Sequence, residues 1–219
     1  MYDNKEYVAT ERTRVRRKPS RGSYDRELAH SILDEALSCH LGFAVDGQPY
    51  VIPTIHARVG ELIYLHGSRA SRALLTLEGG ARCCVTVTLV DGLVLARSAL
   101  HHSLNYRSVV VLGTAREVTD AAEKRSALEA VVEHIVPGRT TEARGPSEAD
   151  VRSTFVLAVA MDEVSAKVRE GPPVDNREDH ELHVWAGELP LASGTAAPIP
   201  DPELRPGIEV PAYLSGWRR

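Results

Sequence analysis

The segment HHSLNYRSVVVLG, residues 101–113, places several hydrogen-bonding side chains directly before an apolar, β-branched stretch. Its imidazole, amide, phenol and guanidinium groups belong to His101, His102, Asn105, Tyr106 and Arg107. Groups of these types bind ligands, but they also collect in loops that bind nothing. The segment alone therefore leaves two interpretations open: a ligand site at the mouth of a strand, or a polar loop that enters a sheet.

A second polar segment, LHGSRASR at residues 65–72, lies at an expected turn from a strand into a helix. Backbone N–H groups at a helix start attract an anion, and serine hydroxyls with a guanidinium give charge-assisted hydrogen bonds to a phosphate. The spacing matches neither the P-loop nor the G-x-G-x-x-G fingerprint. A phosphate site and a capped helix with solvated arginines therefore both stay open.

The apolar stretch YVIPTIHARV, residues 50–59, carries Pro53 in its middle. Proline cannot donate a backbone hydrogen bond to a neighbouring strand, so it is unfavourable in a fully paired central strand. The stretch therefore predicts an interruption of the pairing, and a plain β-bulge is the favoured explanation. The alternative is a ligand that lies flat on this backbone and accepts hydrogen bonds from Thr54 and its neighbours.

The histidines do not form a metal-binding motif. Of the nine in the chain, His101 and His102 adjoin the first polar segment, and His56 and His66 end two expected strands. Neither H-x-x-x-H nor H-E-x-x-H occurs, so these rings would have to be brought together by the tertiary fold. We predict no metal site and assign the histidines structural or substrate-facing roles.

Charge and cysteine content restrict the partners and the compartment. The chain has 26 basic and 30 acidic residues, a formal net charge of -4, so no overall field attracts nucleic acid or an anionic membrane. The exception is the basic run RTRVRRKPSR, residues 12–21, which we interpret as a solvated arm, with a nucleic-acid arm or a partner clasp as alternatives. The cysteines, Cys39, Cys83 and Cys84, show no C-x-x-C spacing, which favours reduced thiols in a cytoplasmic protein. No stretch has the length and apolarity of a membrane span or a signal peptide.

The chemistry-bearing segments are connected by a pattern of strands and helices. Amphipathic spacing predicts helices over residues 23–38, with a serine at its start, over 68–80, and from Asp120 to Pro137. Apolar stretches separated by Asp46-Gly47, Gly60 and Asp91-Gly92 predict hairpins. About six strands and three peripheral helices indicate a mainly β, α+β architecture in which an antiparallel sheet closes into a small barrel.

The chain is predicted to form one domain with two extensions. The domain covers residues 23–195, the basic arm covers residues 1–22, and a proline-rich tail covers residues 196–219 and is expected to extend along a surface.

Three segments in this order resemble the flavin-nucleotide-binding branch of the pyridoxamine 5'-phosphate oxidase-like proteins. They are YVIPTIHARVGELIYLHGSRASR, VTVTLVDGLVLARSALHHSLNYRSVVVLGTAREV and VWAGELPL. The resemblance extends over residues 20–195. It implies an FMN-binding split β-barrel and a homodimer that holds FMN in grooves between its subunits.

The resemblance also implies which residues contact the cofactor. Family positions beside the flavin ring match Ile52, Pro53, Thr54 and Ile55, and the phosphate-binding serine and basic residue match Ser71 and Arg72, with Ser68 as a third contact. The groove is implied to be lined by Asn105, Tyr106, Arg107, Ser108 and Trp185. Asn105 and Arg107 are hypothesised to stabilise the negative charge that reduction places near N1 and O2 of the ring.

The resemblance favours an FMN-dependent oxidoreductase that acts on an unknown small molecule, with a nicotinamide nucleotide as a candidate electron donor. Family members that oxidise B6 vitamers follow the tryptophan with an arginine, whereas Trp185 is followed by Ala186-Gly187-Glu188, which argues against that reaction. Three alternatives stay open: an F420-dependent reductase, a non-catalytic flavin or haem carrier or sensor, and a DNA-associated regulator that uses residues 12–21.

Overall fold

The computed structural model describes residues 5–214 and residue 217, with the side chains of residues 72 and 78 outside the description. Its helices are α1 (Arg26–Glu35), α2 (Arg72–Glu78), α3 (Ala121–Ile135) and α4 (Glu148–Ser153). Its strands are β1 (Gly22–Ser23), β2 (Cys39–Val45), β3 (Gln48–Thr54), β4 (His56–Val59), β5 (Leu62–Ser68), β6 (Arg82–Leu95), β7 (Ser103–Glu117), β8 (Thr154–Ala160), β9 (Glu163–Arg169) and β10 (Gly187–Pro190). Short 3-10 turns are η1 (Pro19–Arg21), η2 (Ala99–His101), η3 (Arg139–Thr141), η4 (Arg177–Glu181) and η5 (Ala212–Leu214).

The strands form one antiparallel sheet with the order β3-β2-β6-β7-β8-β5-β4, to which β1, β9 and β10 add at the sides. β3 and β4 follow each other in the chain but stand at opposite ends of this path and do not pair, so the sheet is not closed. The predicted mainly antiparallel, split-barrel architecture is therefore confirmed. The described residues form ten strands where about six were expected, because short strands such as β1, β4 and β10 carry too few residues to show an alternating pattern.

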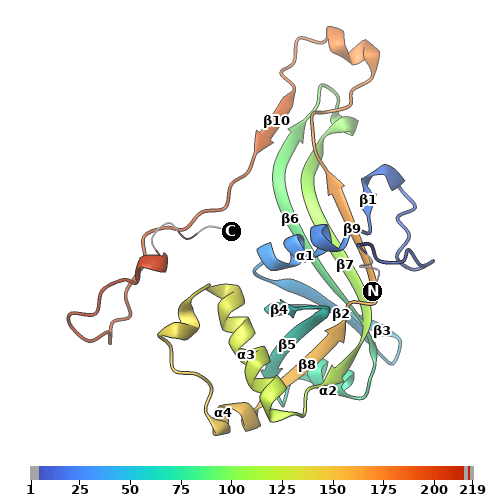
Figure 1. The fold of residues 1–219 in the computed structure, drawn as a ribbon. Helices are drawn as coiled ribbons and strands as arrows, with labels where there is room; N and C mark the ends of the chain where they lie inside the picture. Colours follow the sequence, from blue (N-terminus) through green and yellow to red (C-terminus); the bar gives the residue numbers. More distant parts are fainter. Residues whose placement is uncertain (1–4, 215–216, 218–219) are drawn as a thin grey trace.

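The core lies on both faces of the sheet. The larger cluster packs α1 and α2 against the sheet and includes Ile32, Leu33, Leu77 and Phe155, each at most 1% exposed. A smaller cluster around Tyr64 and Val156 packs α3 against the other face. Figure 1 shows α3 and α4 beside the lower part of the sheet and α1 across its middle.

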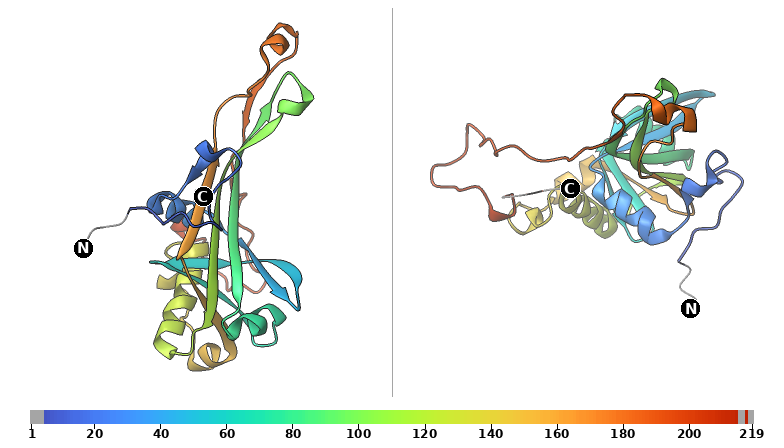
Figure 2. Two further views of the ribbon diagram at one scale, coloured as in Figure 1. Left: turned by 90° about the vertical axis from the view of Figure 1, so that its right-hand side faces the viewer. Right: turned by 90° about the horizontal axis from the view of Figure 1, so that it is seen from above.

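β6 and β7 continue beyond the packed part of the sheet as a long two-stranded arm. Figures 1 and 2 show this arm rising away from the helices, with β10 beside it. β10 pairs with the end of β6, from Gly187 opposite Leu95 to Pro190 opposite Gly92. Two parts of the chain far apart in sequence therefore meet on the arm.

The three predicted helices are present as α1, α2 and α3. Asp120 caps α3 by accepting a hydrogen bond from the Glu123 N–H at 2.7 Å. Ser147 and Asp150 form a capping box at α4. The cap of α1 is Asp25, which accepts from the Leu28 N–H, and not the expected serine.

Two expected interruptions take a different form. Asp91-Gly92 is not a hairpin turn: β6 runs through it, and the register shift between Val90 and Gly92 is a β-bulge. The prediction was wrong because the same dipeptide suits a bulge as well as a turn. Pro53 does not cause a bulge either, because β3 keeps its register with β2 and is an edge strand, where proline is tolerated.

The N-terminal segment packs against the sheet, whereas the C-terminal segment extends away from it. The N-terminal segment returns to the sheet: Tyr7 is buried, and its hydroxyl donates to Glu61 at 2.8 Å. The C-terminal segment leads away from the arm, as the right view of Figure 2 shows, and Tyr213 reaches the η3 region, where its hydroxyl accepts from Arg139 at 2.8 Å. None of the described helices has the length and apolarity needed to cross a membrane.

Candidate functional site

The predicted ring-contacting residues lie on the open edge of β3 and in the break after it. Ile52 is 39% exposed, Ile55 is 38% exposed, and Pro53 is exposed between them. Neighbouring Val51 is 66% exposed. An edge strand that presents several large apolar side chains to solvent is unusual, because such edges invite pairing or binding. This surface has the apolar character that a flat aromatic ring requires.

The predicted phosphate-binding residues lie in the turn from β5 to α2. The Ser71 N–H donates to the Ser68 carbonyl at 2.9 Å, and the Ser68 hydroxyl accepts from the Ala70 N–H at 3.2 Å. Ser71 is the N-cap of α2, yet its hydroxyl makes no capping hydrogen bond. Arg72 begins α2, and its side chain lies outside the described part of the structure. The Ser71 hydroxyl is therefore not committed to the helix that it precedes.

The pairing of β4 with β5 brings these two sets together. His56 pairs with Leu65, so the residues before His56 and those after Leu65 leave the pair at the same end. Ile52 to Ile55 and the Ser68 to Ser71 turn therefore lie at one end of the sheet. We call these residues, together with Arg72, the lower group.

Asn105, Tyr106 and Trp185 lie on the arm instead. Asn105 is buried, donates from Nδ2 to Glu188 at 2.6 Å, and accepts a hydrogen bond from Arg169. Trp185 precedes β10 and is 67% exposed. We call Asn105, Tyr106 and Trp185 the upper group.

Arg107 and Ser108 lie between the two groups and are engaged within the protein. Arg107 donates to Glu35 at the end of α1 and to Asp91 in the β6 bulge, and these hydrogen bonds raise the pKa of the guanidinium. The Ser108 hydroxyl donates to the Lys167 carbonyl at 3.2 Å. The role of both residues toward a flavin stays a prediction.

The lower and upper groups are far apart on one chain. The Ala115 N–H donates to the carbonyl of Ala81, just after α2, so α2 lies beside the C-terminal end of β7. Asn105 lies near the other end, and the ten residue steps from Asn105 to Ala115 span about 33 Å at the ordinary rise of a strand. The structure therefore does not bring Asn105 together with the β5–α2 turn within one protomer.

The histidines occupy three different environments. His56 is fully buried, with Nε2 at 3.0 Å from the Leu33 carbonyl oxygen and its ring beside that of His134. His66 Nδ1 is buried and has no hydrogen-bond partner among the described groups, and burial lowers the pKa of His66. At the tip of the arm, Ser98 contacts both histidines: its hydroxyl lies 2.7 Å from His101 Nδ1 and its carbonyl 3.0 Å from His102 Nδ1.

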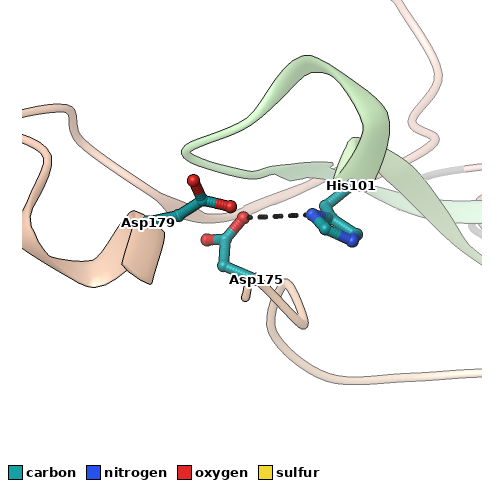
Figure 3. Close-up of side chains that lie close together, drawn as sticks. All are labelled: His101, Asp175 and Asp179. Carbon is teal, nitrogen blue, oxygen red and sulfur yellow. Dashed lines mark ion pairs between the residues drawn. The ribbon is translucent and has the colours of Figure 1, made fainter. Parts of the chain in front are cut away.

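One cluster in the described residues has the composition of a metal site. His101, Asp175 and Asp179 place their ligand atoms within 4.8 Å of one another, as Figure 3 shows. However, both oxygens of Asp175 accept from the Arg97 N–H at 3.1 Å, and the Arg97 guanidinium lies 3.1 Å from the same carboxylate. The cluster therefore already contains its cation.

Sequence reasoning missed the acids and the arginine that organise the arm. Asp91 was hidden inside an apparent turn signal, and Glu35 inside an amphipathic helix, so neither pointed to Arg107. Arg169 ends a strand that reads as ordinary, but it is only 5% exposed, which is rare for an arginine. No spacing rule connects it with Asn105, which lies 64 residues earlier.

The protein has the split-barrel fold. Three features define it: the open antiparallel sheet, its exposed apolar edge and the β5–α2 turn. This fold is of the flavin-binding type. A scan against family models matches residues 25–168 to the pyridoxamine 5'-phosphate oxidase family. The chain belongs to this family, as the sequence resemblance predicted.

Two solved structures are similar to the chain over most of its length. One is the flavocytochrome Anf3 from Azotobacter vinelandii, with 37% identity, a TM-score of 0.88, and coverage of 95% of this chain and 97% of that one. The other is an FAD and heme binding protein from Mycobacterium smegmatis, with 34% identity, a TM-score of 0.85, and coverage of 89% and 96%. A search of curated proteins finds no match.

Proposed function

We propose that this protein is a flavin-dependent oxidoreductase, and that two copies of the chain hold each flavin between them. The observation that carries the proposal is the division of the predicted site. The lower group offers an apolar edge and a phosphate-type turn, and α2, which follows that turn, lies beside Ala115, about 33 Å along β7 from Asn105 of the upper group. A homodimer lets the lower group of one protomer meet the upper group of its partner.

The residues of the lower group fit a flavin nucleotide. Ile52 and Ile55 provide an apolar shelf, and the Ser71 hydroxyl has no partner in its own helix cap. FMN and FAD share the ring, the ribityl chain and the first phosphate, so the same residues serve either one. The sequence predicts FMN, while the name of the M. smegmatis relative includes FAD.

In this proposal the protein binds and orients the flavin, and the flavin carries out the electron transfer. A bound flavin supplies hydride and single-electron chemistry to a small-molecule substrate, with a nicotinamide nucleotide as electron donor. The β3 edge orients the ring and excludes water from one face. Ser68, Ser71 and Arg72 hold the phosphate by hydrogen bonds and charge.

The test is to release the cofactor from the purified protein, identify it by absorbance and mass, and measure the oligomeric state by sedimentation. A flavin and a dimer are expected. A colourless monomer that binds neither FMN nor FAD contradicts the proposal, and binding of F420 in their place supports the deazaflavin alternative. A bound flavin that neither NADH nor NADPH reduces, with no acceptor restoring turnover, favours a carrier or sensor.

Haem binding is a second candidate function, and His66 is the observation that favours it. Haem iron needs a neutral imidazole. His66 adjoins the lower group, and burial lowers its pKa, which favours the neutral imidazole. Both similar structures are of proteins whose names include a haem group or a cytochrome.

Haem titration followed by absorbance tests this candidate. A sharp Soret band is expected in the wild-type protein and its loss in His66→Gln, with His180→Gln, an exposed histidine in η4, as the matched control. An unchanged Soret band in His66→Gln contradicts the assignment of His66.

A further inference from the structure

Four cations from separate parts of the chain line one cavity that the proposed flavin function does not use. The cavity has a volume of about 580 Å³ and is bordered by Arg17, Lys18, Arg21, Arg169 and the histidine pair His101 and His102. The basic run that the sequence presents as an arm is therefore placed against the β6–β7 arm, beside the loop at its tip.

The pairing of β1 with β9 fixes this placement. Gly22 lies opposite Lys167, so η1, which directly precedes β1, packs at the end of β9, where Arg169 is the last residue. Figure 1 shows β1 beside β9. The loop that carries His101 and His102 closes another side of the cavity.

Arg169 is buried and forms no ion pair among the described residues, and the nearby charge of Glu188 only partly offsets the cost of its burial. Its guanidinium donates to three neutral acceptors, the Asn105 side chain and the carbonyls of Gly171 and Pro172, and its Nε has no acceptor among the described groups. Burial and the nearby charge of Arg21 lower the pKa of Arg169. A buried cation in this situation is costly unless an anion compensates it.

The cations of the basic run that line the cavity also form no ion pair among the described residues. In the part of the chain that the structure describes, no ion pair involves Arg17, Lys18 or Arg21, although Arg14 and Arg16 of the same run both pair with Glu11. The one acid that borders the cavity is Asp175, which is neutralised by Arg97 and has no exposed side-chain surface. The cavity therefore has a net positive charge.

The backbone at Lys18 is held in an uncommon conformation. Its φ of 56° and ψ of 62° lie in the left-handed region, which is unfavourable for a lysine and more so before a proline. Such residues persist where the surrounding structure holds them, frequently at ligand sites. This conformation begins η1 and presents Lys18 and Arg21 to the same cavity.

We propose that this cavity is a binding site for a multiply charged phosphoanion, such as the diphosphate of a nucleotide. Several guanidinium groups and an ammonium group suit phosphate oxygens, because guanidinium forks bind two oxygens at once. The diphosphate has two candidate sources: an exchangeable nucleotide, or, as part of the proposed flavin function, the second phosphate of an FAD whose first phosphate is held by the lower group of the other protomer.

The test compares two double variants that remove the same charge from the same run. Arg17→Gln with Arg21→Gln removes cations of the cavity, and Arg14→Gln with Arg16→Gln is the control. Binding of inorganic pyrophosphate and of ADP to the purified protein is measured by calorimetry, and the flavin that each protein carries is identified by mass. The binding measurement does not depend on the flavin proposal, so failures of the two proposals are distinguishable.

An exchangeable source predicts pyrophosphate and ADP binding that falls at least about tenfold in the cavity variant and stays unchanged in the control. A resident source predicts no added binding to the wild type, with FAD present there and in the control but lost from the cavity variant. Either result supports the site. Equal behaviour of the two double variants in both measurements overturns the proposal.

Discussion

The guanidinium of Arg107 binds the carboxylate of Glu35 with both terminal nitrogens, at 2.5 and 2.8 Å, and so ties β7 to the end of α1. Its Nε and Nη2 also donate to Asp91, at distances between 2.7 and 3.2 Å. One side chain thus connects a helix, a long strand and the bulge of the neighbouring strand.

Loss of this connection is expected to destabilise the fold. Arg107→Met leaves two partly buried carboxylates without their cation, which we expect to lower the free energy of unfolding by about 1–3 kcal/mol. Urea denaturation measures this change. Arg16→Met is the control, because Arg16 and Glu11 are each 74% exposed, and it is expected to change the free energy by less than about 0.5 kcal/mol. Equal effects of the two variants would show that the connection is not stabilising.

The same Arg107 variant tests the hypothesis that this residue supplies a donor to the flavin. Under conditions where the variant is folded, we expect weaker flavin binding and a lower reduction potential, because a positive charge near the ring stabilises the reduced, anionic form. Unchanged flavin affinity and potential would restrict Arg107 to its structural role.

Ser71 is expected to affect the ligand more than the stability. An N-cap serine normally contributes about 1 kcal/mol, but the Ser71 hydroxyl makes no capping bond. Ser71→Ala should therefore lower the free energy of unfolding by less than about 0.5 kcal/mol while weakening flavin binding about tenfold.

The matched control for Ser71 is Ser147→Ala, since the Ser147 hydroxyl does accept from the Asp150 N–H in the α4 capping box. It is expected to cost about 1 kcal/mol and to leave flavin binding unchanged. Fluorescence titration with FMN and FAD and urea denaturation measure both variants. If Ser71→Ala leaves flavin binding unchanged and Ser147→Ala weakens it, the phosphate does not bind at Ser71.

Local chemistry predicted the helices better than the strand connections. Asp120 identified the start of α3, because capping depends on neighbours within one turn. The prediction of a turn at Asp91-Gly92 was wrong because the conformation of this dipeptide depends on distant residues. Whether it forms a turn or a bulge depends on Arg107 and β10.

The sequence also predicted the local parts of the candidate site better than the contacts between distant segments. The order of the sequence segments indicated the family and the residues of the lower group, which the β4–β5 pairing places at one end of the sheet. The sequence could not show that Asn105 lies about 33 Å along β7 from Ala115, which is beside the end of α2, because this depends on how far the arm extends. Nor could it show that Arg169 contacts Asn105, a contact formed only when β7 and β9 pair.

Stability is expected to decrease as the pH falls below about 6.5. Burial lowers the pKa of His66 from its ordinary value of 6.5, so the unfolded chain takes up a proton at a pH where the folded chain stays neutral. Acidification therefore favours the unfolded state, by up to about 1.4 kcal/mol per pH unit for one such group. His30, whose pKa is lowered by burial and by Arg58, adds in the same direction.

Urea denaturation between pH 7.5 and 5 measures this dependence. His66→Gln is expected to show a shallower decrease than the wild type, because its contribution to proton uptake is gone. His180→Gln, an exposed control, should keep the wild-type slope. If the unfolding free energy of His66→Gln depends on pH as steeply as that of the wild type, His66 is not the source of the pH dependence.

The attachment of β10 to the arm depends on Gly92. A Cβ added at Gly92 would lie 3.1 Å from the Leu189 carbonyl oxygen, closer than backbone atoms normally allow. Gly92→Ala is therefore expected to loosen β10 and to expose the segment from Trp185 to Pro190 to proteases, with a smaller effect on the packed part of the sheet. Gly194→Ala is the control, since nothing lies within 4 Å of a Cβ at that position. Limited proteolysis with mass detection should show faster cleavage near Gly187 in the Gly92 variant alone. Equal cleavage in both variants would mean that the β6 bulge absorbs the added methyl group and that β10 does not depend on the glycine.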